Sequence, residues 1–451
     1  MALAPFFERI YSALGGHLAV SRDDLSTALQ GVTVGVACGD HVSDNDSWIG
    51  ELSTNLLARL YPRIAITGAE QQAASLRNLA LNINPEVEIV AEAPESLTIG
   101  IGKGTSSAAL FPSANGWVAK LGYSQNEGGP PNPYSAGAAA TFAAAEVFRR
   151  IFLKSVSSDD VSVSLLNFDK TCGAELDLPS SNLGDVLFVA VGAVGNAAIW
   201  ALARDARRHG HFILIDNEQL ELSNLQRYVL ASYKDISRQK VLLGREVLNS
   251  SRIAVETVTE TLESFSEMNG GIRTPTLCIS VDNIASRRAA QALLPKLVIN
   301  GWTGDRALGV SWHVFSREAA CLACLYQPHG EGVSQTEQAA RALGLTAERA
   351  ALLWVTEIWG QTGRFLHREL GREYVPSVPK FSFPTKWAAN VSKQLEPAPY
   401  FVSSGGWRIL IYAFCLQPPK DGCSTLRGVC RMRKRECRAA RALVLSSLKT
   451  N

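Results

Sequence analysis

The hydrophobic pattern of the first third of the chain predicts an alternation of buried strands and amphipathic helices. Short apolar runs, typical of strands in a parallel sheet, occupy residues 32–37, 63–67, 87–91 and 97–101. Between and after them, apolar residues recur at helical spacing over residues 48–60, 69–81 and 136–153. Residues 1–30 show the same spacing and predict a helical lead-in. Strands that alternate with helices in this way indicate an open α/β sheet.

A second alternation of the same kind begins after residue 180. Apolar strands are predicted at residues 186–191, 212–215, 254–259, 276–281, 297–300 and 309–315, with helices from 193 to about 210 and from 240 to 250. A chain of 451 residues also exceeds what one hydrophobic core organises. We therefore predict an α/β protein of two halves, residues 1–165 and 166–451, each with a Rossmann-like open sheet.

The second half carries the residue pattern of a nucleotide site. Its first predicted strand turns at Gly192 and Gly195 into an alanine-rich helix, and its second strand ends at Asp216. Glycines let backbone approach a phosphate, a helix N-terminus offers free N–H groups, and an acid at this position accepts hydrogen bonds from ribose hydroxyls. Ala190 replaces the first glycine of the usual G-x-G-x-x-G motif, so the pattern alone also fits an ordinary buried turn.

Two cations after Asp216 favour a triphosphate over a dinucleotide. Arg227 and Lys240 are placed where a loop and the next helix could return them to one pocket. A dehydrogenase needs no positive charge there, because its glycine turn already neutralises the pyrophosphate. A nicotinamide-dependent oxidoreductase is therefore the less favoured alternative. A later strand delivers Asp282 to the carboxyl edge of the sheet, where a carboxylate with phosphate oxygens is a usual environment of Mg²⁺.

The run from Asp216 through Glu221-Leu-Ser-Asn-Leu-Gln-Arg227, with Lys240 beyond it and Asp282-Asn283 after a later strand, resembles the ThiF/MoeB/HesA superfamily, which includes the ubiquitin-activating enzymes. The resemblance is close over residues 184–326. It implies a ThiF-like second half that uses ATP and Mg²⁺ to adenylate the C-terminal glycine of a ubiquitin-like protein. The implied nucleotide-binding residues are Gly192, Gly195, Asp216, Glu218, Asn224 and Asn283, and the implied catalytic residues are Arg227, Lys240, Asp282 (the Mg²⁺ ligand) and Arg9.

The first half lacks these groups. Cys38-Gly39-Asp40-His41 follows its first predicted strand, and Gly68-Ala69-Glu70 follows its second. By analogy with members of the superfamily that pair a degenerate adenylation half with an active one, residues 1–165 would be an inactive partner domain fused in cis, so that the chain forms a pseudo-dimer. Arg9 resembles the arginine that such a partner half extends into the active site. An unrelated α/β domain is the alternative for this half.

Cys321 and Cys324, which follow a predicted strand, resemble the first half of the family's structural zinc site. Cys423 and Cys430 in the C-terminal tail are the candidates for the other two ligands, although the tail has no second C-x-x-C. Family members that pass their substrate to a conjugating enzyme often carry a thioester cysteine in the next segment, but residues 325–414, with a predicted helical insertion at 335–370, contain no cysteine. Either a C-terminal cysteine serves, or the enzyme stops at the adenylate.

The composition of the chain limits the classes of partner that we expect. The formal net charge of +2 argues against a dedicated nucleic-acid binder, and the basic cluster from Arg427 to Arg441 fits a solvated helix face. The sequence has no stretch long enough to span a bilayer and no secretory signal, so we expect a cytoplasmic protein without membrane contact. Nine cysteines, an odd number, fit reduced thiols and a metal. The predicted partners are a ubiquitin-like substrate and a conjugating enzyme; an inactive scaffold stays open because of Ala190.

Overall fold

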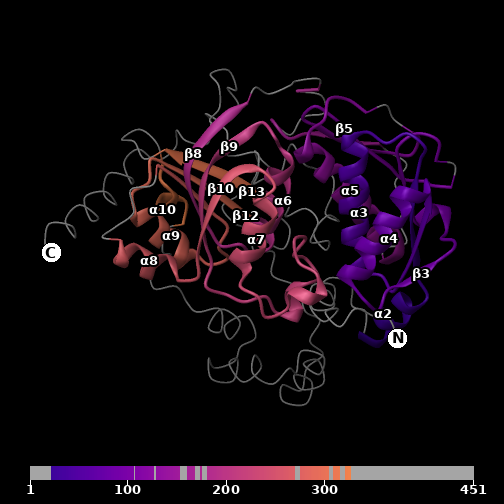
Figure 1. Cartoon of the computed structure of the whole chain (residues 1–451), viewed down its shortest axis with the longest axis horizontal. Coiled ribbons are helices and arrows are strands. Elements are labelled where there is room, and N and C mark those ends of the chain that lie inside the picture. The colour runs from indigo at the N-terminus through magenta and orange to yellow at the C-terminus, as the bar shows by residue number, and fades with distance from the viewer. Residues whose placement is uncertain are drawn as a thin grey trace, which may run out of the picture. The chain divides into compact units, whose positions relative to one another are not determined.

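The computed structural model describes residues 22–105, 107–125, 128–152, 160–167, 173–174, 180–269, 275–303, 308–314 and 320–326. Except for Tyr326, these residues belong to one compact unit, and two parallel sheets organise it (Figure 1). Arg9, the predicted insertion at 335–370, the basic cluster and the tail cysteines Cys423 and Cys430 lie outside the described residues. None of the described helices is both long and apolar enough for a membrane crossing.

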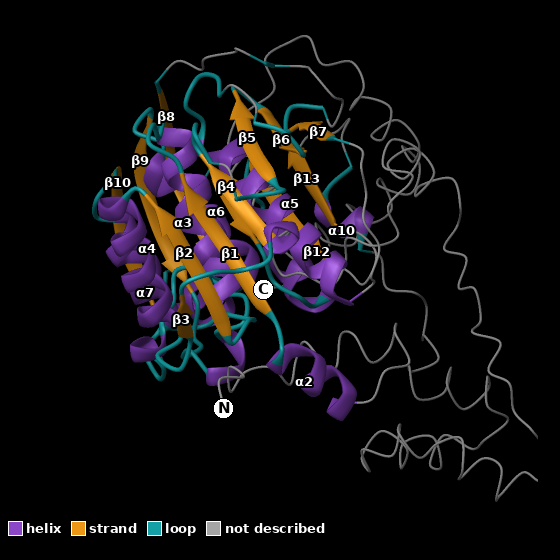
Figure 2. Cartoon of the chain, turned by 90° about the vertical axis from the view of Figure 1, so that its right-hand side faces the viewer, coloured by secondary structure: helices purple, strands orange, loops and turns teal. Residues whose placement is uncertain are grey.

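The first half is organised around a four-stranded parallel sheet in the order β3-β2-β1-β4, with α3 and α4 against it (Figure 2). Val34, Val36, Ile64 and Ile66 on its central strands are all buried, as in a parallel sheet covered by helices. A small antiparallel sheet, β5-β6-β7, follows along the chain. The elements are α2 (Arg22–Gln30), β1 (Thr33–Cys38), α3 (Asp44–Ala58), β2 (Arg63–Gly68), α4 (Glu70–Ile83), β3 (Glu88–Val90), η1 (Glu95–Leu97), β4 (Thr98–Ile101), β5 (Phe111–Asn115), β6 (Val118–Gly122), α5 (Pro133–Phe152) and β7 (Val161–Ser164).

The second half contains a six-stranded sheet in the order β10-β9-β8-β11-β12-β13. Its strands run parallel apart from β13, which pairs antiparallel with β12. The elements are β8 (Ser181–Val189), α6 (Ala193–Arg204), β9 (Arg208–Ile215), η2 (Leu222–Asn224), η3 (Tyr233–Asp235), α7 (Lys240–Leu248), β10 (Arg252–Val258), α8 (Leu262–Met268), β11 (Thr276–Ile279), α9 (Ile284–Ala292), β12 (Leu297–Thr303), β13 (Leu308–Val314) and α10 (Leu322–Leu325).

The two sheets share one strand order. When the strands of each half are numbered from its own beginning, both sheets read 3-2-1-4, and the second sheet continues with strands 5 and 6. This is the order of a Rossmann-like nucleotide-binding fold. The predicted α/β class with two Rossmann-like open sheets is thus confirmed. The hairpin of β5 and β6 was not predicted, because both strands are buried on both faces and show no alternation of polar and apolar residues.

The predicted end of the first helix of the second half, near Gly210, is wrong. The helix α6 ends at Arg204, and β9 already begins at Arg208. Asp205 turns the chain between them, since its carboxylate accepts hydrogen bonds from Nε of Arg207 at 2.6 Å and Nε of Arg208 at 3.1 Å. The charged run from Arg204 to Arg208 therefore contains a tight turn where the sequence suggests a continuing helix.

One hydrophobic core spans both halves. The helix α5 lies within it, and every residue from Pro133 to Phe148 is buried. This helix packs on α3 and the β5-β6 hairpin of its own half and on α6 of the second half. Phe142 of α5 belongs to the same cluster of buried residues as Ile199 and Phe212 of the second half. Because elements of both halves bury this stretch of α5 on all sides, the helix joins the two halves.

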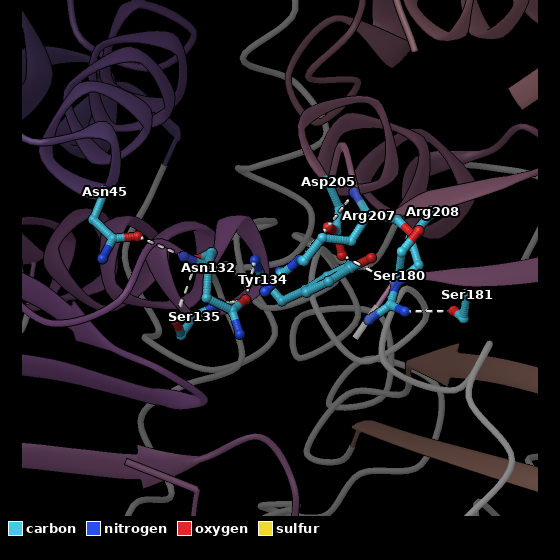
Figure 3. Close-up of polar contacts among 9 residues, drawn as sticks. All are labelled: Asn45, Asn132, Tyr134, Ser135, Ser180, Ser181, Asp205, Arg207 and Arg208. Atoms are coloured by element: carbon cyan, nitrogen blue, oxygen red, sulfur yellow. Dashed lines mark hydrogen bonds and ion pairs between the residues drawn. The ribbon is translucent and has the colours of Figure 1, made fainter. Parts of the chain in front are cut away.

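A buried polar network also joins α5 to the second half (Figure 3). The Tyr134 hydroxyl hydrogen-bonds with both Asp205 and Arg208, which form a buried ion pair with each other. Arg208 also donates to Oγ of Ser181, the first residue of β8, at 2.5 Å. Burial, followed by the charge of Asp205, raises the pKa of the Tyr134 phenol. Because a buried charge without its partner is costly, this network fixes how α5 meets the second half.

Candidate functional site

Three parallel strands of the second sheet end side by side at one edge. Val189 of β8 pairs with Ile215 of β9 on one side and with Ile279 of β11 on the other. The residues that follow these strands are the turn at 190–195, Asp216 and the segment with Asp282. Ligands of open α/β sheets bind at such a carboxyl edge, beside the reversal of strand order. The register of the strands therefore brings together the groups that the sequence places at strand ends.

The turn between β8 and α6 leaves the N-terminus of the helix open. Gly192 is the N-cap residue of α6, and neither a side-chain cap nor an acidic residue occupies the first turn. A methyl group at Gly195 would lie 2.4 Å from the carbonyl oxygen of Ala190, so this close approach requires glycine. An uncapped helix N-terminus presents N–H groups and the positive end of the helix dipole, which together attract an anion.

Asp216 holds this turn in place. Its Oδ2 accepts the N–H of Val191 at 2.8 Å, and its Oδ1 accepts the N–H of Glu218 at 2.9 Å. Asp216 is buried, and this burial raises the pKa of its carboxyl although the two backbone donors and Lys240 act in the opposite direction. Each carboxylate oxygen can accept more than one hydrogen bond, so Asp216 can also receive a ribose hydroxyl.

The loop that follows, residues 217–239, is closed at its base by backbone hydrogen bonds. Leu220 N donates to the carbonyl of Arg238, and Ser237 N donates back to the carbonyl of Leu220, both at 2.8 Å. Asn224, one of the predicted nucleotide-binding residues, is buried, and its Oδ1 accepts the N–H of Glu221 at 3.1 Å. The side-chain oxygen of Asn224 therefore shapes the loop, and its amide N–H groups are what it can offer to a phosphate.

Tyr228 brings the two predicted cations together, and sequence reasoning missed it. The guanidinium carbon of Arg227 lies 5.2 Å and Nζ of Lys240 lies 5.3 Å from the centroid of the Tyr228 ring. The ring is buried, and its hydroxyl oxygen would be 3.7 Å from a methyl group at Gly192. Tyr228 thus extends from the glycine turn to both cations. The available signal was an aromatic residue directly after the arginine of the Asn-Leu-Gln-Arg run.

Lys240 is a buried cation and not a solvated helix residue. Its side chain is 5% exposed, and its Nζ forms an ion pair with Glu218, whose side chain is 67% exposed. Burial is the largest single influence and lowers the pKa of Lys240, but the Glu218 hydrogen bond, Tyr228 and Asp216 together raise it above its ordinary value. Lys240 therefore carries its positive charge at neutral pH.

Asp282 and Asn283 have different local roles. Asn283 caps α9, because its Oδ1 accepts the N–H of Ser286 at 2.7 Å. Asp282 is exposed, and its Oδ1 lies 3.4 Å from Nδ2 of Asn283. The carboxylate of Asp282 is thus not needed to cap the helix and fits the Mg²⁺ that the sequence resemblance implies. Asn283, which we expected to bind nucleotide, uses its side-chain oxygen to cap the helix.

The equivalent edge of the first sheet is closed by its own backbone. Lys103, just beyond β4, donates its N–H to the carbonyl of His41 and accepts the N–H of Asp40, both at 3.1 Å. The helix α3, which corresponds to α6, begins with a capping box in which Ser43 Oγ accepts the N–H of Asp46 and the Asp46 carboxylate accepts the N–H of Ser43. Side-chain oxygens therefore occupy the helix N-terminus that a phosphate would need.

Cys321 and Cys324 lie together at α10, with their Sγ atoms 3.4 Å apart. Two sulfur atoms on one tetrahedral zinc lie roughly 3.8 Å apart, so the pair fits half of a zinc site. The hydrogen bond with Cys324 lowers the pKa of the Cys321 thiol to about 6, which favours the metal-binding thiolate. In the part of the chain that the structure describes, no group of three metal-binding side chains occurs, and the predicted partners Cys423 and Cys430 lie outside that part.

Two family models match the chain. The model of the ThiF family matches residues 180–371, and the model described as prokaryotic E2 family C matches residues 41–153. Among curated proteins, the uncharacterized protein y4jF of Sinorhizobium fredii (strain NBRC 101917 / NGR234) is 34% identical over 365 residues. The alignment covers 76% of this chain and 70% of that protein.

Solved structures similar to this chain include E. coli MccB with MccA-N7isoASN, at 24% identity and a TM-score of 0.28, covering 32% of this chain and 43% of that chain. E. coli MccB with ATP has 16% identity and a TM-score of 0.29, covering 52% of this chain and 56% of that chain. E. coli tRNA N6-threonylcarbamoyladenosine dehydratase, TcdA, has 19% identity and a TM-score of 0.23, covering 26% and 50%. This chain thus spans about half the length of each of these solved chains.

Proposed function

This chain belongs to the ThiF family, and we propose that its second half uses ATP to adenylate the carboxyl group of a protein substrate. Membership of this family supports ATP-dependent adenylation. The observation that carries the proposal is the meeting of four features at one sheet edge: the open N-terminus of α6, buried Asp216, the two cations on the Tyr228 ring, and Asp282.

In the proposed reaction, the substrate carboxylate attacks the α-phosphorus of ATP. A carboxyl oxygen–phosphorus bond forms, the bond from the α-phosphorus to the bridging oxygen breaks, and pyrophosphate leaves with the electron pair. Protein groups accelerate such a step mainly by positioning and by stabilising charge. Asp216 holds the ribose, and Arg227 and Lys240 hold the phosphates. Asp282 would hold Mg²⁺, which when bound neutralises charge on the leaving pyrophosphate.

Glu218 has a specific place in this scheme. Its carboxylate is the ion-pair partner of Lys240, and its side chain is largely exposed. A triphosphate offers oxygens of the same charge to Lys240, so ATP can replace Glu218 without leaving a buried cation unpaired. Glu218 would then move into solvent, where its own charge is hydrated at little cost, instead of binding the nucleotide as the sequence resemblance implies.

We further propose the C-terminal glycine of a ubiquitin-like protein as the substrate carboxyl group. The support is the similarity of the Glu221–Arg227 run to the superfamily members that act on such proteins. Passage to a conjugating enzyme through a thioester needs a reactive cysteine, and residues 41–153, which match the E2 family model, contain none. Cys38, just before this segment, is buried, which raises its pKa to about 11 and makes it a poor nucleophile. A thioester would therefore have to form elsewhere in the chain.

We also propose that the first half is an inactive adenylation half that pairs with an active second half. Two observations support this proposal: its sheet repeats the 3-2-1-4 order, and backbone and capping groups close the edge where a nucleotide would bind. The half would therefore have kept a nucleotide-binding architecture while losing the place for phosphate.

The exchange of labelled pyrophosphate into ATP tests the proposal, with a small protein that ends in glycine as the candidate substrate. We expect substrate-dependent exchange, and we expect Asp282→Ala to reduce it by about 10² or more with little change in stability. Thr261→Ala is the matched control: loss of the α8 cap, in which the Thr261 side chain accepts the N–H of Ser264, should cost about 1 kcal/mol of stability and leave the exchange intact. Near-normal exchange in Asp282→Ala would show that the magnesium ligand is wrongly assigned.

The wild-type protein distinguishes the alternative functions. A change in nicotinamide absorbance without exchange would indicate the oxidoreductase alternative, and the absence of both activities would indicate a scaffold.

A further inference from the structure

One face of α3 in the first half makes polar contacts with the second half at regular spacing. Glu51, Asn55 and Arg59 follow one another four residues apart, so they lie in one row along the helix and its C-cap. Glu51 accepts from Nε1 of Trp200 at 3.3 Å and forms an ion pair with Arg204, both on α6. The other two residues of the row reach a different part of the second half.

Asn55 and Arg59 bind main-chain carbonyls of residues 225–231, which we call the phosphate segment. Arg59 Nη1 donates to the carbonyl of Leu225 at 2.5 Å, and Nη2 donates to the carbonyl of Ala231 at 2.6 Å. Asn55 Nδ2 donates to the carbonyl of Val229 at 3.0 Å, and its Oδ1 accepts Arg59 Nε at 2.8 Å. Arg59 is 1% exposed, so these carbonyls have no alternative partner in bulk water.

The phosphate segment is held from its other side by the glycine turn. Asn196 on α6 accepts the N–H of Leu230 on its Oδ1 at 3.1 Å and donates from Nδ2 to the carbonyl of Val191 at 2.9 Å. Val191 is in turn bound to Asp216. The segment that carries Arg227 and Tyr228 therefore lies between the first half and the nucleotide turn, and hydrogen bonds fix it to both.

Burying the charge of Arg59 costs folding free energy, so stability alone does not account for an arginine at this position. Burial lowers the pKa of Arg59 to about 9, and the charge of Asp235 opposes this only in part. Well-packed apolar side chains in place of a buried charge usually cost no stability and often add some. What a guanidinium supplies and an apolar group does not is simultaneous, directional binding of carbonyls from both ends of one short segment.

We propose that Asn55 and Arg59 of the first half are positioning residues that order the phosphate segment of the second half and so hold Arg227 and Tyr228 ready for the phosphates of ATP. The first half thereby completes the nucleotide site through main-chain carbonyls, without touching the nucleotide. The consequence for ATP rests on the function proposed above, whereas the ordering of the segment does not.

The test compares Asn55→Ala and Arg59→Lys with Glu51→Ala in the full chain. Glu51→Ala is the matched control, because it removes a contact of the same row to α6 and leaves the phosphate segment untouched. Hydrogen exchange of the backbone amides of residues 225–231 should become at least about tenfold faster in the first two variants and stay unchanged in the control. Lysine can replace at most one of the two guanidinium contacts, so Arg59→Lys keeps the positive charge but cannot bind the carbonyls of Leu225 and Ala231 together.

The dissociation constant of a non-hydrolysable ATP analogue and the KM for ATP in pyrophosphate exchange are measured on the same variants. We expect both constants to rise about tenfold in Asn55→Ala and Arg59→Lys, with kcat at saturating ATP within about threefold of wild type, because ATP must first order the segment. Unchanged amide exchange and ATP affinity in these variants, or an equal effect of Glu51→Ala, would overturn the proposal. A wild-type chain that binds no ATP would refute the proposed function instead, and the amide-exchange comparison would still decide the role of Asn55 and Arg59.

Discussion

Ala190→Gly should stabilise the protein, although glycine usually destabilises. Ala190 directly follows β8 of the second half and has φ +71, in the left-handed region. Its backbone is bound on both sides: its N–H donates to the carbonyl of Ile215 at 2.8 Å, and its carbonyl accepts Ser280 Oγ at 2.6 Å. Neither contact involves the Ala190 side chain, so both persist in the glycine variant.

The expected magnitude follows from three contributions. A left-handed conformation costs an alanine about 1–2 kcal/mol relative to glycine. Glycine gives back about 0.4–1 kcal/mol through the greater freedom of the unfolded chain. Loss of a half-buried methyl group costs roughly a further 0.4 kcal/mol. The net result is a gain of about 0.5 kcal/mol in the free energy of unfolding.

Ala197→Gly is the matched control, because Ala197 is a fully buried residue inside α6. There glycine should cost about 1 kcal/mol in helix propensity and nearly as much in lost burial. Denaturant unfolding should thus separate the two variants by about 2 kcal/mol, and Ala190→Gly should keep its pyrophosphate exchange. Equal destabilisation of the two variants would refute the reasoning about backbone strain. It would also mean that the hydrogen bonds with Ile215 and Ser280 do not hold Ala190 in a strained, glycine-like conformation.

Three further predictions concern other parts of the site. Tyr228→Phe should retain ATP affinity, because the ring that contacts both cations remains, whereas Tyr228→Leu should weaken ATP binding about tenfold. Equal binding of ATP by both variants would show that the Tyr228 ring does not contribute to ATP affinity. The folded protein binds the Asp216 proton more tightly than the unfolded chain, so this carboxyl contributes less stability as pH rises from its ordinary value of 3.8 through its raised pKa. The stability of Asp216→Asn relative to wild type should therefore increase over that pH window, and a constant difference would contradict the burial argument. Metal analysis of the chain purified under reducing conditions should find about one zinc per chain, lost in Cys321→Ser; zinc-free wild type would refute the site.

The sequence was most informative where backbone rules act locally. The apolar run 276–281 predicted a buried strand, and the pairing of Ile279 with Val189 ends that strand beside the end of β8, where the glycine turn begins. Apolar strands covered on both faces are continuous runs in the sequence, so the two open sheets were recognisable without long-range information. Short connections between successive parallel strands place pairs such as β8 and β9 side by side, but they do not fix where the order reverses, since β10 and β11 follow each other in the chain and are separated by β9 and β8.

The contacts that the sequence did not reveal are those between residues far apart in the chain. Arg59 and Leu225 are 166 positions apart, and the Arg59 contact is to a carbonyl, so the sequence of the partner segment carries no matching residue. Tyr134 reaches Asp205 and Arg208 in the same way across the two halves. The end of α6 was misplaced for a different reason: the turn there depends on the ion pair of Asp205 with Arg208, three residues apart, and the spacing of apolar residues carries no sign of it.

The two halves show how one strand order can serve two purposes. In the second half, the carboxyl edge of the sheet is left open, and a glycine turn, an acid and two cations gather there. In the first half, Lys103 closes that edge and Ser43 caps the helix, while the exit of the same helix supplies Arg59 to the neighbouring site. A half that holds its neighbour's phosphate segment gains nothing from a phosphate site of its own, but it must keep α3 in the orientation that the sheet dictates. In the role that we propose for the first half, this requirement is a physical reason for it to keep the architecture of its sheet.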